Sequence, residues 1–365
     1  MFKGLHLSES KFLFKLTAIG WIIFKLSSIK LWFIFDRQFP IISISEHFEN
    51  TNALFHNGLG FLSFALLLSL IYKINKKSLA LFLGIETLLL LTDVMRWQPT
   101  EYQFYISFLI YLFKPKQFKT YLILLLSATY IFSGLQKLNL RFINFIWSMS
   151  ILKDFLDLPY EYAFSKPIKA LGFLIPLIEI LCGFFMLSKW KKYAFITVII
   201  IHIFILIYIG PFGLNINSAV WSWNILMIAY ALFFVFKSSP IRLKHNYLNT
   251  AWLILIFIMP FFNFFEKYYP YFSFELYTGS KHFLYINDKF DNNLALADTT
   301  ITTHKNYYAS TKVTAWSFKE LNIPFPHDKW LYKRFIKSYR RDYPEASPCF
   351  EISYYPYKTK EIFSE

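Results

Sequence analysis

The stretch ALFHNGLGFLSFALLLSLIYKINKK, residues 53–77, decides the fold predicted for this chain. From residue 53 to residue 72 it contains no Lys, Arg, Asp or Glu. A helix needs about 20 apolar residues to cross a bilayer core, so this run is long enough. Lys73, Lys76 and Lys77 follow directly. Because positively charged loops stay on the cytoplasmic side, the stretch predicts a transmembrane helix with a cytoplasmic end.

Eight further apolar segments lie around this one within the first 266 residues. They cover residues 12–35, 79–91, 102–113, 121–136, 168–187, 193–209, 219–236 and 248–265. Several reach bilayer length, whereas segments 79–91 and 102–113 are short and need interfacial flanks or a re-entrant form. The sequence therefore predicts an all-α polytopic membrane bundle of about nine transmembrane or re-entrant helices.

The loops between these segments alternate in charge. The basic loops contain Lys3 and Lys11; Lys73, Lys76 and Lys77; Lys114, Lys116 and Lys119; Lys189, Lys191 and Lys192; and Lys237, Arg242 and Lys244. The acidic loops contain Asp36, Glu46 and Glu49; Asp93 and Glu101; and Asp154, Asp157 and Glu161. This alternation predicts a cytoplasmic N-terminus and places the residues after Glu266 outside the membrane.

The chain changes character after its predicted membrane domain, residues 1–266. Residues 267–365 are charged and rich in turn-forming residues. Residues 283–286 and 350–354 have the pattern of strands, and residues 327–339 have helical spacing with Pro344 beyond them as a stop. We expect residues 267–365 to form a small extracytoplasmic α+β domain, whose surface is a candidate site for a protein partner.

The composition excludes several classes of function. Apolar residues make up 56% of the chain, and the net charge of +15 lies largely in the short basic loops. There it sets the topology and contacts lipid headgroups, so nucleic acid is not an expected partner. The two cysteines, Cys182 and Cys349, lie in different predicted regions, and we predict no disulfide framework, haem attachment or metal site.

Four ionisable side chains lie near the centres of apolar segments: Lys25, Glu86, Glu179 and His202. Placing a charged group at the centre of a membrane helix costs at least ~2.5–3.5 kcal/mol on insertion scales. Because of this cost, each of the four is a functional candidate. Lys25 can instead pair with one of the glutamates and only fix helix packing. No second metal ligand lies at helical spacing from His202. We interpret Glu86, Glu179 and His202 as polar support inside the membrane.

The stretch TYIFSGLQKLNLRF, residues 129–142, carries the sharpest functional signal. Tyr130, Gly134, Lys137 and Arg141 are spaced by 4, 3 and 4 residues, which predicts a stripe along one helical face. Gly134 lets a ligand or another helix approach the backbone closely. Lys137 either serves a ligand or extends its ammonium group to the interface at the helix end.

Two more polar and aromatic stretches end at the same predicted membrane face. They are TDVMRWQPTEYQF, residues 92–104, and GPFGLNINSAVWSWN, residues 210–224. We expect them to join Lys137 around one outward-facing ligand cavity. The candidate ligand-binding residues are Arg96, Trp97, Gln98, Tyr130, Gly134, Asn217, Trp221 and Asn224. Trp221 is equally compatible with an interfacial aromatic belt.

Three motifs in this region resemble one known family. YIFSGLQKLN is similar to the Gly-x-x-Lys-Leu-Asn/Asp segment of the vitamin K-dependent γ-glutamyl carboxylases and their bacterial HTTM-domain relatives. LIPLIEILCGFFML resembles the acidic helix that follows in that family, and HIFILIYIGPFG its histidine-containing helix. The resemblance covers about residues 10–265. Where the family has a Trp-x-x-His element, this chain reads Trp97-Gln98-Pro99-Thr100.

The resemblance implies a location in a bacterial inner membrane and a quinone or hydroquinone of the vitamin K type as cofactor. It identifies Lys137 with the catalytic base that deprotonates the hydroquinone, Glu179 with the family's acid and His202 with its histidine. Oxygen would then convert the hydroquinone to an epoxide. The strong base released on the way would take a second proton from a substrate carbon.

Two other functions remain open from the sequence. LIPLIEILCGFFML also resembles the DoxX-like membrane proteins, which suggests a subunit of a quinone-linked complex. Alternatively, the chain is a non-catalytic envelope protein that binds a partner through its C-terminal domain.

Overall fold

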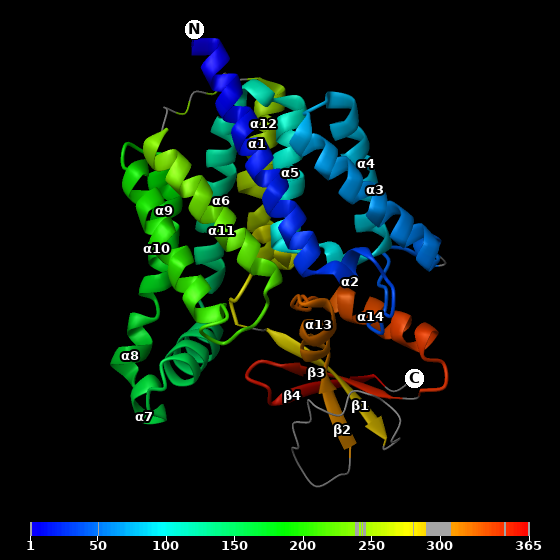
Figure 1. Ribbon diagram of the computed structural model, residues 1–365. Helices are drawn as coiled ribbons and strands as arrows, with labels where there is room; N and C mark the ends of the chain where they lie inside the picture. Colours follow the sequence, from blue (N-terminus) through cyan, green and yellow to red (C-terminus); the bar gives the residue numbers. More distant parts are fainter. Residues whose placement is uncertain are drawn as a thin grey trace. The chain divides into compact units, whose positions relative to one another are not determined.

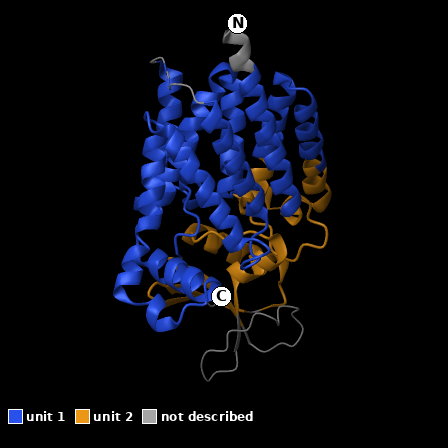
Figure 2. Ribbon diagram, turned by 60° about the vertical axis from the view of Figure 1, so that its left-hand side comes forward, with its two compact units in different colours: residues 1–27, 61–87, 97–279 blue, residues 28–60, 88–96, 280–365 orange. Residues whose placement is uncertain are grey.

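The structure is a computed structural model that describes residues 2–49, 51–237, 241, 243, 246–279, 281–289, 308–346 and 348–363. These residues are mostly helical, with one small antiparallel sheet near the C-terminus (Figure 1). The chain forms two compact units (Figure 2). Unit 1 comprises Met1–Ser27, Phe61–Thr87 and Trp97–Gly279. Unit 2 comprises Ser28–Gly60, Leu88–Arg96 and Ser280–Glu365.

Unit 1 is a bundle of long helices that run side by side in both views (Figures 1 and 2). Its main helices are α1 (Phe2–Ser27), most of α3 (Ala53–Tyr72) and of α4 (Lys76–Thr92), α5 (Pro99–Phe113), α6 (Phe118–Lys137), α9 (Leu174–Met186), α10 (Lys191–Ile209), α11 (Ala219–Phe236) and α12 (Tyr247–Leu253). Shorter elements connect them: η3 (Pro115–Gln117), the π-helix η4 (Phe142–Phe155), α7 (Tyr160–Ala163), α8 (Lys166–Leu171), η5 (Ile254–Ile258), η6 (Met259–Phe265) and η7 (Pro270–Ser273).

Six helical segments in the described part of the chain are long and apolar enough to cross a membrane. They are Ala53–Tyr72, Pro115–Lys137, Lys166–Met186, Lys191–Ile209, Ala219–Phe236 and Tyr247–Phe265. These helices indicate a membrane protein, but the expected count of about nine is not confirmed. The helix α1 carries Lys11, Lys15 and Lys25, and α4 and α5 have 17 and 15 residues, which is short for a span.

Several of the basic segments meet at one end of unit 1. Lys119 at the start of α6 donates a hydrogen bond to Glu9 Oε2 of α1 (2.9 Å), and its ammonium lies 5.3 Å from the ring centroid of Phe233 near the end of α11. Lys15 of α1 donates to the backbone oxygen of Tyr72 at the end of α3 (3.4 Å). The side of the membrane that this end faces stays a prediction. Arg242 and Lys244 lie outside the described residues.

Unit 2 contains a four-stranded antiparallel sheet with the strand order β2-β1-β3-β4. Its elements are α2 (Ile29–Trp32), η1 (Glu46–Phe48), η2 (Val94–Arg96), β1 (His282–Lys289), β2 (Tyr308–Lys312), α13 (Val313–Leu321), α14 (Lys329–Asp342), β3 (Cys349–Tyr354) and β4 (Thr359–Phe363). The expected strands, residues 283–286 and 350–354, lie within β1 and β3, and the expected helix corresponds to α14. The sheet and helices agree with the expected small α+β fold.

The hydrophobic core of unit 2 includes a residue from the loop that follows the first apolar segment. Phe39 is 1% exposed, and its ring centroid lies 4.9 Å from that of Trp316 and 5.4 Å from that of Phe335. Glu320 accepts hydrogen bonds from the backbone N–H groups of Gln38 and Phe39. Residues 28–60 therefore belong structurally with the C-terminal residues, whereas residues 267–279, which the sequence assigned to the C-terminal domain, belong to unit 1.

The basic face of α14 partly contacts the acidic segment 46–49 within the same unit. Lys337 Nζ lies 2.6 Å from Glu46 Oε1 and 3.2 Å from Glu49 Oε1, and Arg334 lies 3.4 Å from Glu49. The Lys337 ammonium lowers the pKa of the Glu46 carboxyl through a hydrogen bond and its charge. These ion pairs thus connect α14 to residues 46–49, which follow Phe39 in the connection between α2 and α3.

Candidate functional site

The helix α6 positions the lysine that the sequence singled out. It is buried along most of its length and ends at Lys137. Asn139 then accepts a hydrogen bond from the backbone N–H of Phe142 (2.9 Å), at the beginning of η4. The prediction that Arg141 continues the stripe of Tyr130, Gly134 and Lys137 is therefore wrong. Arg141 lies beyond the end of the helix that contains the other three residues.

Lys137 forms a buried ion pair with Glu179 of α9. Its Nζ donates to both carboxylate oxygens of Glu179 (2.7 Å each) and to Ser133 Oγ one turn earlier (2.7 Å). The side chains of Lys137 and Glu179 are 11% and 6% exposed. An ammonium group has three N–H donors, so these three contacts match its full hydrogen-bonding capacity. Lys137 therefore points into the bundle and does not extend to solvent as a snorkelling lysine would.

Reciprocal glycines bring α6 and α9 close enough for this pair. A Cβ atom at Gly134 of α6 would lie 2.6 Å from the backbone oxygen of Pro176. A Cβ atom at Gly183 of α9 would lie 2.7 Å from the backbone oxygen of Ser127. Ser127 Oγ also donates to the oxygen of Gly183 (2.7 Å). Gly134 thus serves helix packing, one of its two expected roles, and the predicted contact with a ligand has no support.

A second hydrogen-bonded chain joins α6, α10 and α11. The hydroxyl of Tyr130 contacts His202 Nε2, and His202 Nδ1 lies 2.6 Å from Asn224 Oδ1. Asn224 Nδ2 donates to the backbone oxygen of Val220 (2.8 Å), which turns Oδ1 toward the histidine. In this network Nδ1–H donates to Asn224, so Nε2 carries the lone pair that accepts the Tyr130 hydroxyl.

These polar groups line a cavity of about 400 Å³ in unit 1. Lys137, Glu179, Ser133, Tyr130, His202 and Asn224 all contribute to its wall. The remaining lining is largely apolar and includes Ile175, Ile178, Ile201, Ile205 and Phe274. An apolar cavity with a few converging polar groups is the usual form of a small-molecule site, and its volume is within the ~300–1,000 Å³ typical of such sites.

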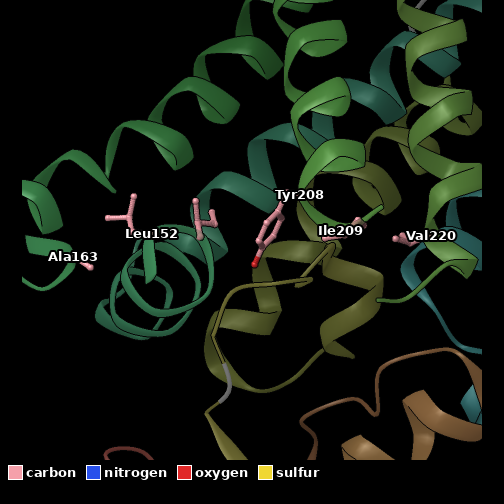
Figure 3. Close-up of a cluster of buried hydrophobic side chains, with 6 residues drawn as sticks. Leu152, Ala163, Tyr208, Ile209 and Val220 are labelled. Atoms are coloured by element: carbon pink, nitrogen blue, oxygen red, sulfur yellow. The ribbon is translucent and has the colours of Figure 1, made fainter. Parts of the chain in front are cut away.

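An apolar cluster forms another part of the same wall. Figure 3 shows Leu152, Ala163, Tyr208, Ile209 and Val220, which with Ile151 form a buried group at η4, α7, α10 and α11. Ile151, Tyr208, Ile209 and Val220 also line the cavity. The Tyr208 hydroxyl donates to Ser150 Oγ (2.6 Å), so this polar atom is satisfied within the protein. This part of the wall can contact an apolar ligand without leaving Tyr208 unpaired.

Other predicted ligand residues lie near the cavity without lining it. Asn217 Nδ2 donates to the hydroxyl of Tyr277 (2.7 Å), and Tyr277 is a lining residue. Trp221 Nε1 donates to the backbone oxygens of Ile209 and Ile216 (3.2 Å each). Trp221 thus stabilises the turn between α10 and α11 through these hydrogen bonds.

The stretch 92–104 contributes little to the cavity. Trp97 stacks on Phe272, with ring centroids 5.2 Å apart, and Gln98 is buried at the N-terminal end of α5. Of this stretch only Pro99 is a lining residue. The predicted convergence of Gln98 with Lys137 on one cavity wall is therefore not seen.

Arg96 has a different environment, inside unit 2. Its fully buried guanidinium donates to the backbone oxygens of Leu31 (2.7 Å) and Leu89 (2.5 Å) and to Thr92 Oγ1 (3.0 Å). Another of its nitrogens lies 3.2 Å from His56 Nδ1. The expectation that Arg96 lines the cavity is not met, because its donors connect α2 to the end of α4 within its own unit.

Sequence reasoning missed most of the apolar lining. Ile205 and Ile209 follow His202 at positions i+3 and i+7, and Ile175 precedes Glu179 by four residues, so each shares a helical face with a predicted polar residue. These three isoleucines could therefore have been predicted as lining residues from their spacing in the sequence. Phe274 and Tyr277 lie beyond the last apolar segment and gave no such signal.

Comparison with known protein families, with curated proteins and with solved structures finds no match to this chain. Within the described residues, no group of three or more His, Cys, Asp and Glu side chains is arranged to hold a metal ion. The geometry of the cavity is therefore the basis for assigning a function to the chain.

Proposed function

We propose that the chain is a membrane protein that binds a lipid-soluble quinone or hydroquinone in the cavity beside Lys137. The observation that carries this proposal is the meeting of an ion pair, a tyrosine–histidine chain and an apolar lining around about 400 Å³. A ligand of this class has an apolar ring and tail with oxygens at the ring edge. The lining suits the ring, and the polar groups suit the oxygens.

The resemblance to the vitamin K-dependent carboxylases and HTTM-domain proteins supports this ligand class. The residues that carry that resemblance, Lys137, Glu179 and His202, come from three helices and line one cavity. A hydroquinone supplies two acidic hydroxyl groups and a pair of electrons for reaction with oxygen. We propose that the protein removes the proton from a hydroxyl group of the bound hydroquinone.

Lys137 can serve as the base only if its own proton has a destination. Glu179 provides one, because it accepts hydrogen bonds from Lys137 through both oxygens. Transfer of one proton along this contact leaves a neutral amine and a neutral carboxylic acid. A low dielectric favours neutral forms, so the charged and neutral pairs lie closer in energy here than in water. The amine then takes the proton of the bound hydroxyl group.

The first test measures binding. The full-length protein in lipid nanodiscs is titrated anaerobically with menadiol, a short hydroquinone of the vitamin K type. We expect saturable binding that Ile205→Trp abolishes, because the larger side chain fills the cavity without changing a polar group. Lys153→Arg is the control, since Lys153 is 44% exposed and does not line the cavity. Undiminished binding to Ile205→Trp would refute the cavity as the site.

The second test separates binding from proton transfer. Oxygen uptake above that of menadiol alone is measured for the wild type and for Lys137→Arg. Arginine keeps a cation opposite Glu179, but its pKa above ~12 prevents it from acting as a neutral base. We expect menadiol to bind this variant while oxygen uptake falls to background. Wild-type oxygen uptake by Lys137→Arg would contradict the proposed base and leave Lys137 a structural cation.

A further inference from the structure

A second cluster of ionisable side chains lies in unit 1, and none of its members lines the cavity. Lys25 Nζ donates to Glu86 Oε1 (3.0 Å) and Oε2 (2.9 Å), and Ser63 Oγ also donates to Glu86 Oε1. Trp21 Nε1 donates to Glu101 Oε2 (2.6 Å). All five side chains belong to residues that are at most 1% exposed. Four helices, α1, α3, α4 and α5, contribute to the cluster.

The two glutamates of this cluster share one neighbour, Trp21. Its Nε1 donates to Glu101, and its ring centroid lies 5.6 Å from the Lys25 ammonium that is paired with Glu86. Oε1 of Glu101 is buried and receives no hydrogen bond from any donor group in the described part of the chain. Two ionised carboxylates around one lysine have only acceptors and repel each other, whereas a proton on one of them supplies a donor and removes the repulsion.

The charge count leads to the same conclusion. Lys25 supplies one positive charge, whereas Glu86 and Glu101 would supply two negative charges if both were ionised. An uncompensated charge at a site without solvent is strongly unfavourable, and one bound proton removes it. Glu86 already accepts from Lys25 and Ser63, which favours its charged form. Among the described residues, Glu101 accepts a hydrogen bond only from the neutral donor Trp21, so it is the better carrier of the proton.

We infer that Glu86 and Glu101 form a buried proton-binding site in the helical bundle, with the proton held by Glu101 and donated to Glu86. Lys25 balances the remaining negative charge of Glu86. The ligand of this site is a single proton, and its release would leave a net negative charge in the bundle. The site does not depend on the proposed quinone function, because it involves other residues and other helices.

The direct test is infrared spectroscopy of the full-length protein in nanodiscs at pH 7. A protonated carboxyl group has a C=O stretch at higher wavenumber than carboxylates do. We expect the spectrum of the wild type minus that of Glu101→Gln to contain this band. Glu161→Gln is the control, because Glu161 is exposed on α7 and its replacement should leave the band in place. Absence of the band from the wild-type-minus-Glu101→Gln spectrum would overturn the proposal.

Thermal unfolding provides a second, independent readout. A glutamine at position 101 can donate through its amide to Glu86 and accept from Trp21, as the protonated carboxyl does. We expect Glu101→Gln to keep a Tm close to that of the wild type. Glu86→Gln removes the counter-ion of Lys25 and should lower the Tm clearly or prevent folding. If Glu101→Gln lowered the Tm as much as Glu86→Gln does, Glu101 would not be protonated in the wild type.

Discussion

Lys137 Nζ lies 2.7 Å from both carboxylate oxygens of Glu179, so a single ion pair joins the end of α6 to the middle of α9. The pair lies at the wall of the cavity, and each partner is the main compensation for the charge of the other. Replacing either residue alone therefore changes both the chemistry of the cavity and the packing of the two helices.

Replacing Lys137 by Met should destabilise unit 1 by about 3–5 kcal/mol, because it leaves the Glu179 carboxylate buried without a counter-ion. The double variant Lys137→Met/Glu179→Gln removes both charges and should recover most of that loss. The measurement is the free energy of unfolding of the wild type, both single variants and the double variant in a double-mutant cycle. Additive effects of the two replacements would show that the ion pair contributes no coupling energy.

Gly183→Ala should separate α6 from α9 and lower stability. The added Cβ would lie 2.5 Å from Ile131 Cγ1 and 2.7 Å from the backbone oxygen of Ser127, so the helices must move apart. Such overpacking typically costs about 1–3 kcal/mol. Gly84→Ala is the matched control, since nothing lies within 4 Å of a Cβ there and alanine favours a helix by about 0.5–1 kcal/mol. Equal unfolding midpoints for the two variants would contradict the close approach of α6 and α9.

Arg96→Lys should destabilise unit 2 without changing the affinity of the cavity for menadiol. A lysine ammonium cannot span the carbonyl oxygens of Leu31 and Leu89, which Arg96 contacts through Nε and Nη1. The Leu31 oxygen loses its Arg96 donor, and a buried carbonyl left without a donor costs about 1–3 kcal/mol, whereas the Leu89 oxygen keeps the donors Asp93 N–H and Thr92 Oγ1. Denaturation midpoints and the binding titration together check this expectation, with Arg340→Lys as an exposed control on α14. If Arg96→Lys bound menadiol more weakly at unchanged stability, Arg96 would instead be a ligand-binding residue.

Lys312 at the end of β2 should react with amine-directed reagents at unusually low pH. Burial lowers the pKa of its ammonium from 10.5 to about 8, and Nζ lies 3.1 Å from the ring centroid of Phe283. Acylation of Lys312, followed by mass spectrometry across a pH series, should reach half its maximum near pH 8. If its acylation rises only with that of ordinary lysines, near pH ~10.4, the amine is not desolvated.

The same shift sets a direction for the pH dependence of stability. Between pH 8 and 10.5 the unfolded chain keeps the Lys312 proton and the folded chain has lost it. Stability rises with pH wherever the unfolded state binds more protons, so the contribution of Lys312 increases across this window. Below pH 8 both states are protonated, and this contribution is constant at its lowest value.

The helical character of the chain could be predicted because apolar runs such as 53–72 and 219–236 have the length and composition of membrane helices. The number of spans could not be predicted in the same way. Lys25 interrupts the first run, and its charge is accommodated by Glu86, a partner 61 residues away. A window of local hydropathy does not register such a contact.

The polar part of the candidate site was accessible from the sequence because Lys137, Glu179 and His202 are conspicuous in apolar surroundings. Their roles in the site remain predictions. The placement of Arg96 was not accessible, since two of its hydrogen bonds run to backbone carbonyls, which leave no trace in residue types, and His56 lies 40 residues away in the sequence. The π-helix η4, which supplies Phe142 and Ile151 to the lining, likewise has no sequence pattern that distinguishes it from an α-helix.

The core of unit 2 also imposes an order on the biosynthesis of the protein. Phe39 leaves the ribosome well before Trp316 and Phe335, which bury it and follow it by 277 and 296 residues (316 − 39 and 335 − 39). Domains generally fold as they emerge, but this core stays incomplete until residue 335 has been made. Throughout that interval Phe39 lacks these two partners. A chain whose synthesis stops before residue 316 therefore presents an unburied aromatic side chain, by which quality-control factors can distinguish it from a chain in which this core is complete.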